Sequence, residues 1–484
     1  MTPLSPPDLD RLFFPRSIAV VGASPKTGVR VQGNNYIKGS IGLDFKGKIY
    51  PVHPQAKSIL GFDAYPCVRD IPGEVDLVIF SIPAKNVLPV MEDCVAKGVR
   101  FVHSFTAGFS ETGIEEFAAL EAKLVAMAKG AGIRLVGPNC MGVYCPEGGL
   151  SFQPFLPDTA GPVGFFSQSG QLAGMFVMKA AALGLRFSKV VSFGNASDLS
   201  AHEFLAYLGQ DEKTKFIGSY LEGLKDGREF FQVARAITRK KPLVVYKGGQ
   251  TEGGSRATQS HTAAIAGSPR LWQAVCRQAG IIPVDSLDEM ACTIAVLQEG
   301  SPLPRGNRVA ILGGAGGGSV TMTDIAEKGG LAVPHLSPHT IEKLREFVPP
   351  EGSSVKNPLD VGFAAYTSDN FLKLIDLLRD DPHIDALIFL QPAGMFYRML
   401  GRQLVRTMIE QSLKARQRLQ KPMFVVVEQD DAFGFPEAAK EARARYEDEK
   451  VATLPSFEMA VRVVNNLKKY GDYLASPAPD APTA

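Results

Sequence analysis

Three segments of the sequence repeat one order of features: SIAVVGAS at residues 17–24, GPVGFFSQSG at 161–170 and RVAILGGAGGGS at 308–319. In each segment, a short run of aliphatic or aromatic residues leads into a loop of glycine and serine, and a helical pattern follows. This order is typical of the first strand, loop and helix of a doubly wound α/β domain. The sequence therefore predicts an α/β protein with three such domains.

Further strand-like runs alternate with amphipathic segments of helical length, such as 115–129 and 226–239. These runs lie at 75–82, 99–105, 190–193, 216–221, 242–246, 386–390 and 423–427. Alternation of strands and helices predicts parallel sheets that are flanked by helices.

Two stretches rich in proline and glycine, at 145–162 and 300–306, lack a periodic pattern and predict domain boundaries near 150 and 303. The expected domains are 1–150, 151–303 and 304–475. The last residues, 476–484 (SPAPDAPTA), have little to bury and are predicted to form a disordered tail.

The composition excludes several classes of protein. The chain has 484 residues, 45% of them hydrophobic and 21% charged, with a net charge of +2. These values exclude collagen-like, coiled-coil and wholly disordered chains, and they disfavour a nucleic-acid partner.

Because no apolar run reaches the roughly 18 residues of a membrane helix and residues 1–10 lack a secretory pattern, a cytoplasmic protein is expected. The cysteines and histidines show no disulfide or metal-site spacing, so no metal site is predicted.

The loop after the first strand is a candidate phosphate site. Residues 22–25 (GASP) would place backbone N–H groups at the carboxyl edge of a sheet, near the start of a helix. The spacing is not GxGxxG, since the next glycine is Gly28, and the second strand (48–51) ends without the acidic residue that holds an NAD ribose. A nicotinamide dehydrogenase is therefore disfavoured, and a glycine turn without a ligand is the plain alternative.

Three more strand ends in the first domain carry polar residues, proline or glycine: SIPA at 81–84, SFTAG at 104–108 and GPNC at 137–140. Taken one at a time, each of these segments could simply shape a turn. Several strand ends of an open parallel sheet converge on one crevice, however, so together they predict a ligand site.

The segments SIAVVGAS, KGKIYPVHP, VDLVIFSIPA, AGF and GPNCMG, in this order, resemble the CoA-binding domain of the succinyl-CoA synthetase superfamily. The NDP-forming (ADP-forming) acyl-CoA synthetases are the most similar branch. The resemblance implies a Rossmann-like CoA-binding domain followed by two flavodoxin-like domains of the succinyl-CoA ligase type. It also implies that CoA is bound by Gly22, Ser24, Pro25, Lys57 (or its neighbour Ala56), Ser81, Ile82, Pro83, Phe105, Thr106, Ala107, Asn139 and Cys140.

His261 stands out among the histidines because it lies in a long Gly/Ser/Thr stretch, 247–268, which is expected to be a mobile loop. The strand 216–221 delivers Glu222 to the same sheet edge, where a carboxylate could orient an imidazole. Ser167, Gln168, Ser169 and Gly170 open a helix that could hold an anion. Together these features describe a phosphohistidine site; the alternative is a solvated glutamate beside an ordinary helix cap.

The segments SHTAAIAGS, SYLEG and FFSQSG resemble the active-site histidine, the histidine-orienting glutamate and the phosphate-binding helix start of the acyl-CoA synthetase family. The resemblance implies that acyl-CoA and phosphate give acyl phosphate and CoA, that acyl phosphate phosphorylates His261, and that the phosphoryl group then passes to a nucleotide. A transfer through a covalent intermediate replaces one difficult step with two easier ones.

The third domain offers another glycine-rich helix start, with Gly316, Gly317 and Gly318 in LGGAGGGS. The resemblance implies that this helix start, with NPLDVG at 357–362, faces the phosphohistidine site. On the residues alone, a structural glycine turn is the simpler interpretation.

No further segment of about 200 residues could form an ATP-grasp domain with magnesium ligands. We therefore expect an alpha-type subunit that works with a separate ATP-grasp beta-type chain in an α2β2 assembly, with ATP, ADP and Mg²⁺ on the partner and a small carboxylic acid as substrate. The alternative is a scaffold that senses CoA or acyl-CoA without catalysis; retention of both His261 and Glu222 argues against it.

Overall fold

Strand β1 (Ser17–Val21) lies inside the first sheet, and all five of its residues are buried. The sheet is parallel, with the order β2-β1-β5-β6-β7. The chain passes from β1 to β2 on one side and later to β5 on the other, so the strand order reverses between β1 and β5. The other strands are β2 (Lys48–Val52), β5 (Leu77–Phe80), β6 (Phe101–Ser104) and β7 (Arg134–Val136).

The computed structural model describes residues 8–26, 31–262, 268–314, 316–362, 365–366, 368–428 and 434–477. The chain forms two compact units, Met1–Met290 and Ala291–Ala484. Most of the predicted tail, from residue 478 onwards, lies outside the described residues. No helix in the described part of the chain is long and apolar enough to span a bilayer. Cytoplasmic localisation stays a prediction.

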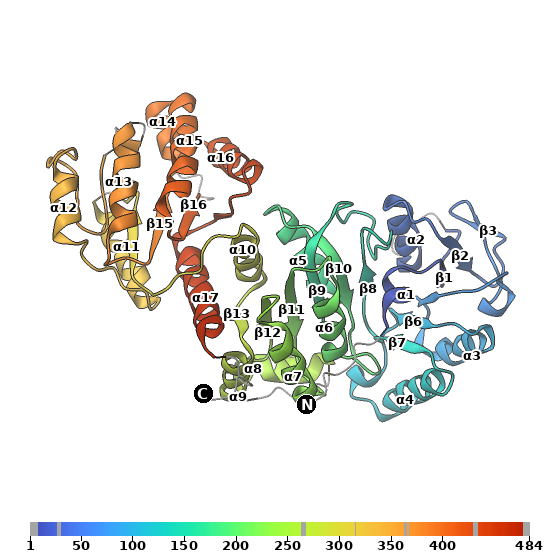
Figure 1. The fold of residues 1–484 in the computed structure, drawn as a ribbon. Coiled ribbons are helices and arrows are strands. Elements are labelled where there is room, and N and C mark those ends of the chain that lie inside the picture. Colours follow the sequence, from blue (N-terminus) through green and yellow to red (C-terminus); the bar gives the residue numbers. More distant parts are fainter. Residues whose placement is uncertain are drawn as a thin grey trace. The chain divides into compact units, whose positions relative to one another are not determined.

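Short elements and helices connect the strands of the first sheet (Figure 1). A hairpin of β3 (Ser58–Ile59) and β4 (Phe62–Asp63) follows β2. The helical segments are α1 (Asp10–Phe13), α2 (Gln32–Gly42), η1 (Val68–Asp70), η2 (Ala84–Asn86), α3 (Val87–Lys97), η3 (Ser110–Thr112) and α4 (Glu115–Gly130).

The second sheet has the order β13-β12-β11-β9-β10-β8. Five strands are parallel: β9 (Ala160–Ser167), β10 (Phe187–Ser192), β11 (Phe216–Leu221), β12 (Leu243–Lys247) and β13 (Ile281–Val284). The edge strand β8 (Gly142–Tyr144) is antiparallel to β10, although it precedes the predicted boundary near residue 150. The helices are α5 (Gly170–Ala181), α6 (Ala201–Gln210), α7 (Gly227–Ile237), α8 (Glu252–Thr262), α9 (Pro269–Ala279) and α10 (Leu287–Gln298).

The second unit contains a parallel sheet of order β14-β15-β16-β17, formed by β14 (Val309–Leu312), β15 (Ala386–Leu390), β16 (Met423–Val426) and β17 (Thr453–Leu454). Its helices are α11 (Gly317–Lys328), α12 (Pro338–Arg345), α13 (Asp369–Asp380), α14 (Ala393–Leu400), α15 (Arg402–Leu419), α16 (Pro436–Asp448) and α17 (Phe457–Ala475). The three predicted strand–loop–helix starts thus lie in three different sheets, and the predicted α/β class with parallel sheets is confirmed.

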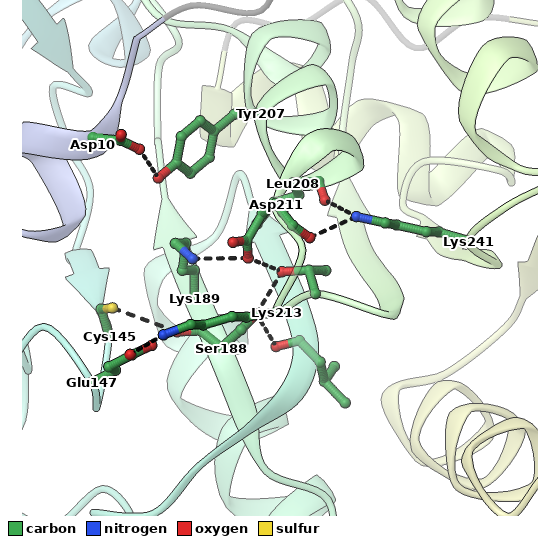
Figure 2. Close-up of polar contacts among 12 residues, drawn as sticks. Asp10, Cys145, Glu147, Ser188, Lys189, Tyr207, Leu208, Asp211, Lys213 and Lys241 are labelled. Carbon is green, nitrogen blue, oxygen red and sulfur yellow. Dashed lines mark hydrogen bonds and ion pairs between the residues drawn. The ribbon is translucent and has the colours of Figure 1, made fainter.

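A buried ion pair lies near the amino end of β10 (Figure 2). The Lys189 side chain is 2% exposed, and its Nζ lies 2.8 Å from Asp211 Oδ2. Thr214 Oγ1 donates to the same carboxylate oxygen at 2.6 Å. The Lys189 ammonium also faces the ring of Phe14, 5.2 Å from its centroid. A charge in this interior depends on these partners, because burial without them carries a large desolvation cost.

Candidate functional site

The carboxyl ends of β1 and β5 meet in close backbone contact. Gly22 has φ +96°, and a Cβ built on it would lie 2.1 Å from the carbonyl oxygen of Ser81. The Ser81 N–H donates to Val21 O at 2.8 Å, which holds the two loops side by side. A side chain at position 22 therefore has no room, and the predicted CoA residues Gly22, Ser81 and Ile82 are neighbours.

Asn34, on α2, forms two hydrogen bonds to the backbone of the predicted phosphate loop. Its Oδ1 accepts from the Ser24 N–H at 2.9 Å, and its Nδ2 donates to Ser24 O at 2.8 Å. Pro25 is exposed beside this pair. The sequence analysis missed Asn34, which is 7% exposed; an asparagine soon after a glycine loop was the available signal.

Two further predicted strand ends are tied to each other. Thr106 Oγ1 donates to Ile82 O at 2.7 Å, and the Asn139 N–H donates to Thr106 O at 2.9 Å. Pro83 and Ala107 are exposed in these loops, and Phe105 is half-buried. The carboxyl edge of the first sheet thus brings together residues from four strand ends.

Cys140 lies beneath this edge and is 3% exposed. Its Sγ donates to Ser104 O at 3.5 Å, and burial raises the pKa of the thiol. The backbone oxygen of Cys140 is 3.0 Å from His103 Nε2, and burial lowers the pKa of His103 to about 4. Both side chains are therefore uncharged at neutral pH, which fits a supporting position better than direct ligand contact.

Lys57 is exposed in the turn between β2 and β3. Its backbone oxygen accepts from Ala64 N–H at 2.9 Å. The preceding turn is closed by His53, whose Nδ1 accepts from the N–H groups of Gln55 and Ala56 at 3.1 and 3.0 Å. His53 thus stabilises the turn after β2, at the position where a dehydrogenase would carry the acidic residue that binds the ribose.

Gly22→Ala is expected to weaken CoA binding at least tenfold. The added methyl group would meet Ser81 O, and a positive φ costs alanine about 1–3 kcal/mol, so both loops must shift. Titration calorimetry with CoA measures the effect. Gly130→Ala is the matched control, because its Cβ would enter open space on a helix. Unchanged affinity in Gly22→Ala would place CoA away from this loop.

The carboxyl edge of the second sheet brings Gln168 and Glu222 together. Gln168 Oε1 accepts from the Glu222 N–H and, at 2.9 Å, from the Gly223 N–H. Gln168 and Glu222 are 8% and 5% exposed. The side chain of Gln168 therefore holds the loop that carries Glu222 against the start of α5.

Ser167 and Ser169 shape the start of α5. Ser169 is the N-cap, and its Oγ accepts from the Leu172 N–H at 3.3 Å. Ser167 Oγ donates to Ser169 O at 2.7 Å, and Gly170 begins the helix. The predicted anion site is thus a capped helix start, and the hydroxyl groups of Ser167 and Ser169 form hydrogen bonds within it.

Two polar residues missed by the sequence analysis surround Glu222. Lys247, 7% exposed at the end of β12, donates from Nζ to Glu222 O at 2.6 Å and to Gly248 O at 2.7 Å. Burial lowers the pKa of this ammonium, and the charge of Glu222 acts in the opposite direction. Burial and then Glu222 raise the pKa of Tyr220. In the sequence, the lysine at the end of an apolar strand was the signal that could have identified Lys247.

The expectation that 247–268 forms a loop is wrong for its central part, because Glu252–Thr262 form helix α8. Thr251 Oγ1 accepts from the Gly254 N–H at 3.0 Å, and Glu252 pairs with Arg256 one turn later at 3.0 Å. His261 lies in the last turn of α8; its side chain, and residues 263–267, lie outside the described part. Helix α8 packs against η3, which follows the Phe105–Ala107 loop.

A small pocket adjoins Gln168 and contains charged groups that sequence reasoning missed. His202 Nδ1 is 2.8 Å from Ser200 Oγ and 3.6 Å from Asp226 Oδ2. Lys225 reaches the backbone oxygens of the loop after β10. The pocket is lined by Gln168, Phe193, Ala196, Ser200, Ala201, His202, Gly223, Leu224, Lys225 and Asp226.

The glycine-rich start in the second unit also forms a helix amino end. Gly316 has φ +52° and precedes α11, which begins at Gly317 and continues through Gly318. Asn357, in the predicted NPLDVG segment, pairs with β14: Oδ1 accepts from the Ile311 N–H at 3.0 Å, and Nδ2 donates to Val309 O at 2.7 Å. Its amide therefore supports the sheet edge within this unit.

Three family models match successive parts of the chain. A CoA binding domain matches residues 16–146, a succinyl-CoA ligase like flavodoxin domain matches 160–297, and a Ligase-CoA domain matches 309–471. The matches follow the three sheets in order.

Relatives are similar along nearly the whole chain. Subunit alpha of the ADP-forming acetate–CoA ligase I of Pyrococcus furiosus is 36% identical over 480 residues, which cover 96% of this chain and 98% of the relative. Subunit alpha of ligase II of that organism is 41% identical over 383 residues, covering 78% and 81%. A solved structure of the dinucleotide forming acetyl-coenzyme A synthetase 1 of Ca. Korarchaeum cryptofilum, with phosphate and ADP, has a TM-score of 0.79, 32% identity and coverage of 97% and 98%.

Proposed function

Since this chain belongs to the family of ADP-forming acetate–CoA ligase alpha subunits, we propose that it is the alpha-type subunit of an acid–CoA ligase. The reaction interconverts acyl-CoA, ADP and phosphate with a carboxylic acid, CoA and ATP. The family resemblance inferred from the sequence is confirmed. The relatives are named as ligases, which favours catalysis over a non-catalytic scaffold.

We propose that CoA binds at the carboxyl edge of the first sheet. The close approach of Gly22 to Ser81 and the hydrogen bonds from Thr106 to Ile82 and from Asn139 to Thr106 support this assignment. Backbone N–H groups of the loop at Ser24 and Pro25 would face the CoA phosphates. Lys57 has the weakest support, because it lies in an exposed turn.

We propose that the carboxyl edge of the second sheet carries the phosphoryl chemistry. A phosphate oxygen attacks the thioester carbonyl of acyl-CoA, the C–S bond breaks, and the thiolate leaves as CoA. An imidazole nitrogen of His261 then attacks phosphorus, and the carboxylate leaves. Finally an oxygen of ADP takes the phosphoryl group and frees the histidine. Glu222 orients the imidazole, and the α5 start at Ser167–Gly170 holds the phosphate.

The single observation that carries this proposal is the contact between Gln168 and the Glu222 loop. A buried glutamine at the start of α5 accepts hydrogen bonds from two backbone N–H groups of the segment that contains the glutamate. Because Gln168 and Glu222 follow different strands, this contact holds the backbone at Glu222 beside the helix start and supports their assignment to one site.

We further propose that ATP, ADP and Mg²⁺ bind to an ATP-grasp beta-type subunit, in an α2β2 assembly. The name "subunit alpha" of the two Pyrococcus relatives supports a partner chain. The three domains proposed are 1–150, 151–303 and 304–475, and in the third the helix start at Gly316–Gly318 is a second candidate for binding an anion.

A phosphoryl-transfer assay tests the proposal. The purified chain is incubated with labelled ATP and Mg²⁺, alone and with an ATP-grasp subunit of the same family. We expect a protein-bound label that is labile in acid and stable in base, and that requires the partner. Tight CoA binding without any label would favour the scaffold alternative.

A further inference from the structure

The loop between β10 and α6 lies against the predicted CoA loop at Gly137–Cys140. A Cβ built on Gly194, which has φ +48°, would be 2.2 Å from Pro138 O. The Asn195 N–H donates to Pro138 O at 3.0 Å, and the Ser197 N–H donates to Gly137 O at 3.1 Å. The first two sheets therefore join through direct backbone contact at this point.

The side chain of Asn195 extends this junction. Asn195 is 5% exposed, and its Oδ1 accepts from Asn139 Nδ2 at 3.4 Å. Its Nδ2 donates to Glu111 Oε2 at 2.6 Å and to Glu121 Oε2 at 3.0 Å. Hydrogen bonds to ionised carboxylates are stronger and shorter than neutral ones. The carboxamide thus links a predicted CoA residue to two acidic groups.

These two carboxylates set the loop that follows β6. Glu111 Oε1 accepts from the Gly108 N–H at 2.6 Å, directly after the predicted CoA residues Phe105–Ala107. Glu121 Oε2 accepts from the Ser110 N–H at 3.0 Å and from Ser110 Oγ at 2.7 Å. Glu111 and Ser110 belong to η3, against which α8 packs. Asn195 therefore also reaches the element that supports the helix of His261.

A lysine connects the same loop to the phosphoryl side. Lys225 Nζ donates to Asn195 O at 2.8 Å and to Ala196 O at 3.1 Å. Lys225 lies three residues after Glu222 in the same loop, and the Gly223 N–H of this loop donates to Gln168 Oε1. A continuous set of contacts thus runs from Asn139 through Asn195 and Lys225 to the Glu222 loop.

We propose that Asn195 is a positioning residue that aligns the CoA thiol with the phosphoryl site for the step between thioester and acyl phosphate. This inference rests on the proposed function. In the direction of synthesis, the CoA sulfur attacks the acyl carbonyl, the C–O bond to phosphate breaks, and the thiol proton ends on phosphate. Reacting atoms held by two different sheets need a rigid link, since a displacement of about 1 Å can cost about 100-fold in rate.

The test separates the two half-reactions in the reconstituted complex. One assay measures histidine labelling from labelled ATP and Mg²⁺; the other measures acetyl-CoA formed from acetyl phosphate and CoA without nucleotide. For Asn195→Ala we expect the turnover rate of the CoA step to fall about 100-fold, with the KM for CoA changed less than about fivefold and labelling retained. Asn370→Ala, which removes the same carboxamide from α13, is the control.

Lys225→Met is the second variant, because its exposed side chain can be removed without opening the core. It should slow the CoA step about tenfold and retain labelling, as expected for the loss of charged hydrogen bonds. If Lys225→Met and a folded Asn195→Ala leave the CoA step unchanged, or slow both half-reactions equally, Asn195 has no positioning role. Absence of label in the wild-type complex would instead refute the proposed function.

Discussion

We expect His261→Ala to abolish the phosphorylation of this chain by ATP and the proposed partner, and with it all turnover between acyl phosphate and ATP. The alanine methyl group offers no nitrogen to accept the phosphoryl group. If Glu222 accepted the phosphoryl group in place of the histidine, the labelled protein would carry an acyl phosphate, which is labile in base. CoA binding should stay within about twofold, because the proposed CoA residues lie at the edge of the first sheet.

The measurement combines label stability in acid and base with CoA calorimetry on the same preparation. His339→Ala is the matched control, since His339 is an exposed histidine on α12. A label that is labile in acid, stable in base and persists in His261→Ala would assign the phosphoryl group to another histidine. His202, in the pocket beside Gln168, would then be the next candidate.

Asp211→Ala is expected to lower the free energy of unfolding by about 3–5 kcal/mol. The substitution leaves the Lys189 ammonium, 2% exposed, without its carboxylate in the interior of the second sheet. Removing one partner of a buried pair costs more than the pair contributes, because the remaining charge stays desolvated. Urea unfolding measures the loss. Asp288→Ala is the control, because the Lys179–Asp288 pair is 40% and 55% exposed and should contribute less than about 1 kcal/mol.

The effect of Asp211→Ala should depend on pH in one direction. Burial opposes ionisation of Asp211, but hydrogen bonds from Lys189 and Thr214 outweigh it and lower the pKa of the carboxyl. A lowered folded-state pKa stabilises the protein above the unfolded value of about 3.9, and this contribution is lost as the pH falls through the folded value. The stability difference between wild type and Asp211→Ala should therefore shrink below about pH 4. A difference that grows in acid would contradict this assignment.

Local sequence patterns predicted the strands well where burial and periodicity agree. The run 216–221 is β11, and 386–390 is β15, because continuous apolar residues between polar ends are typical of a parallel strand. Helix α8 was missed, since its glycine and serine content masked the cap at Thr251 and the Glu252–Arg256 pair. Low helix propensity was overridden there by capping and by packing against η3.

The predicted site residues came from strand ends and from family resemblance. Gly22, Gln168 and Glu222 were predicted because polar or glycine residues directly after apolar strands are local signals. Asn34, Lys247 and Asn195 were missed, because each acts through a backbone or side-chain partner from another segment of the chain. The local signals for Asn34 and Lys247, an asparagine after a glycine loop and a lysine that ends an apolar strand, also occur at polar residues without such a role.

The amino-acid sequence was sufficient for the α/β class, the three strand–loop–helix starts and the family, because these depend on neighbours a few residues apart and on motif order. Tertiary structure alone decided that Lys189 pairs with Asp211, that Gln168 holds the Glu222 loop, and that Asn195 joins the first two sheets. Each of these contacts unites segments far apart in the chain. Its energy depends on burial and exact distance, which exist only once the sheets have formed.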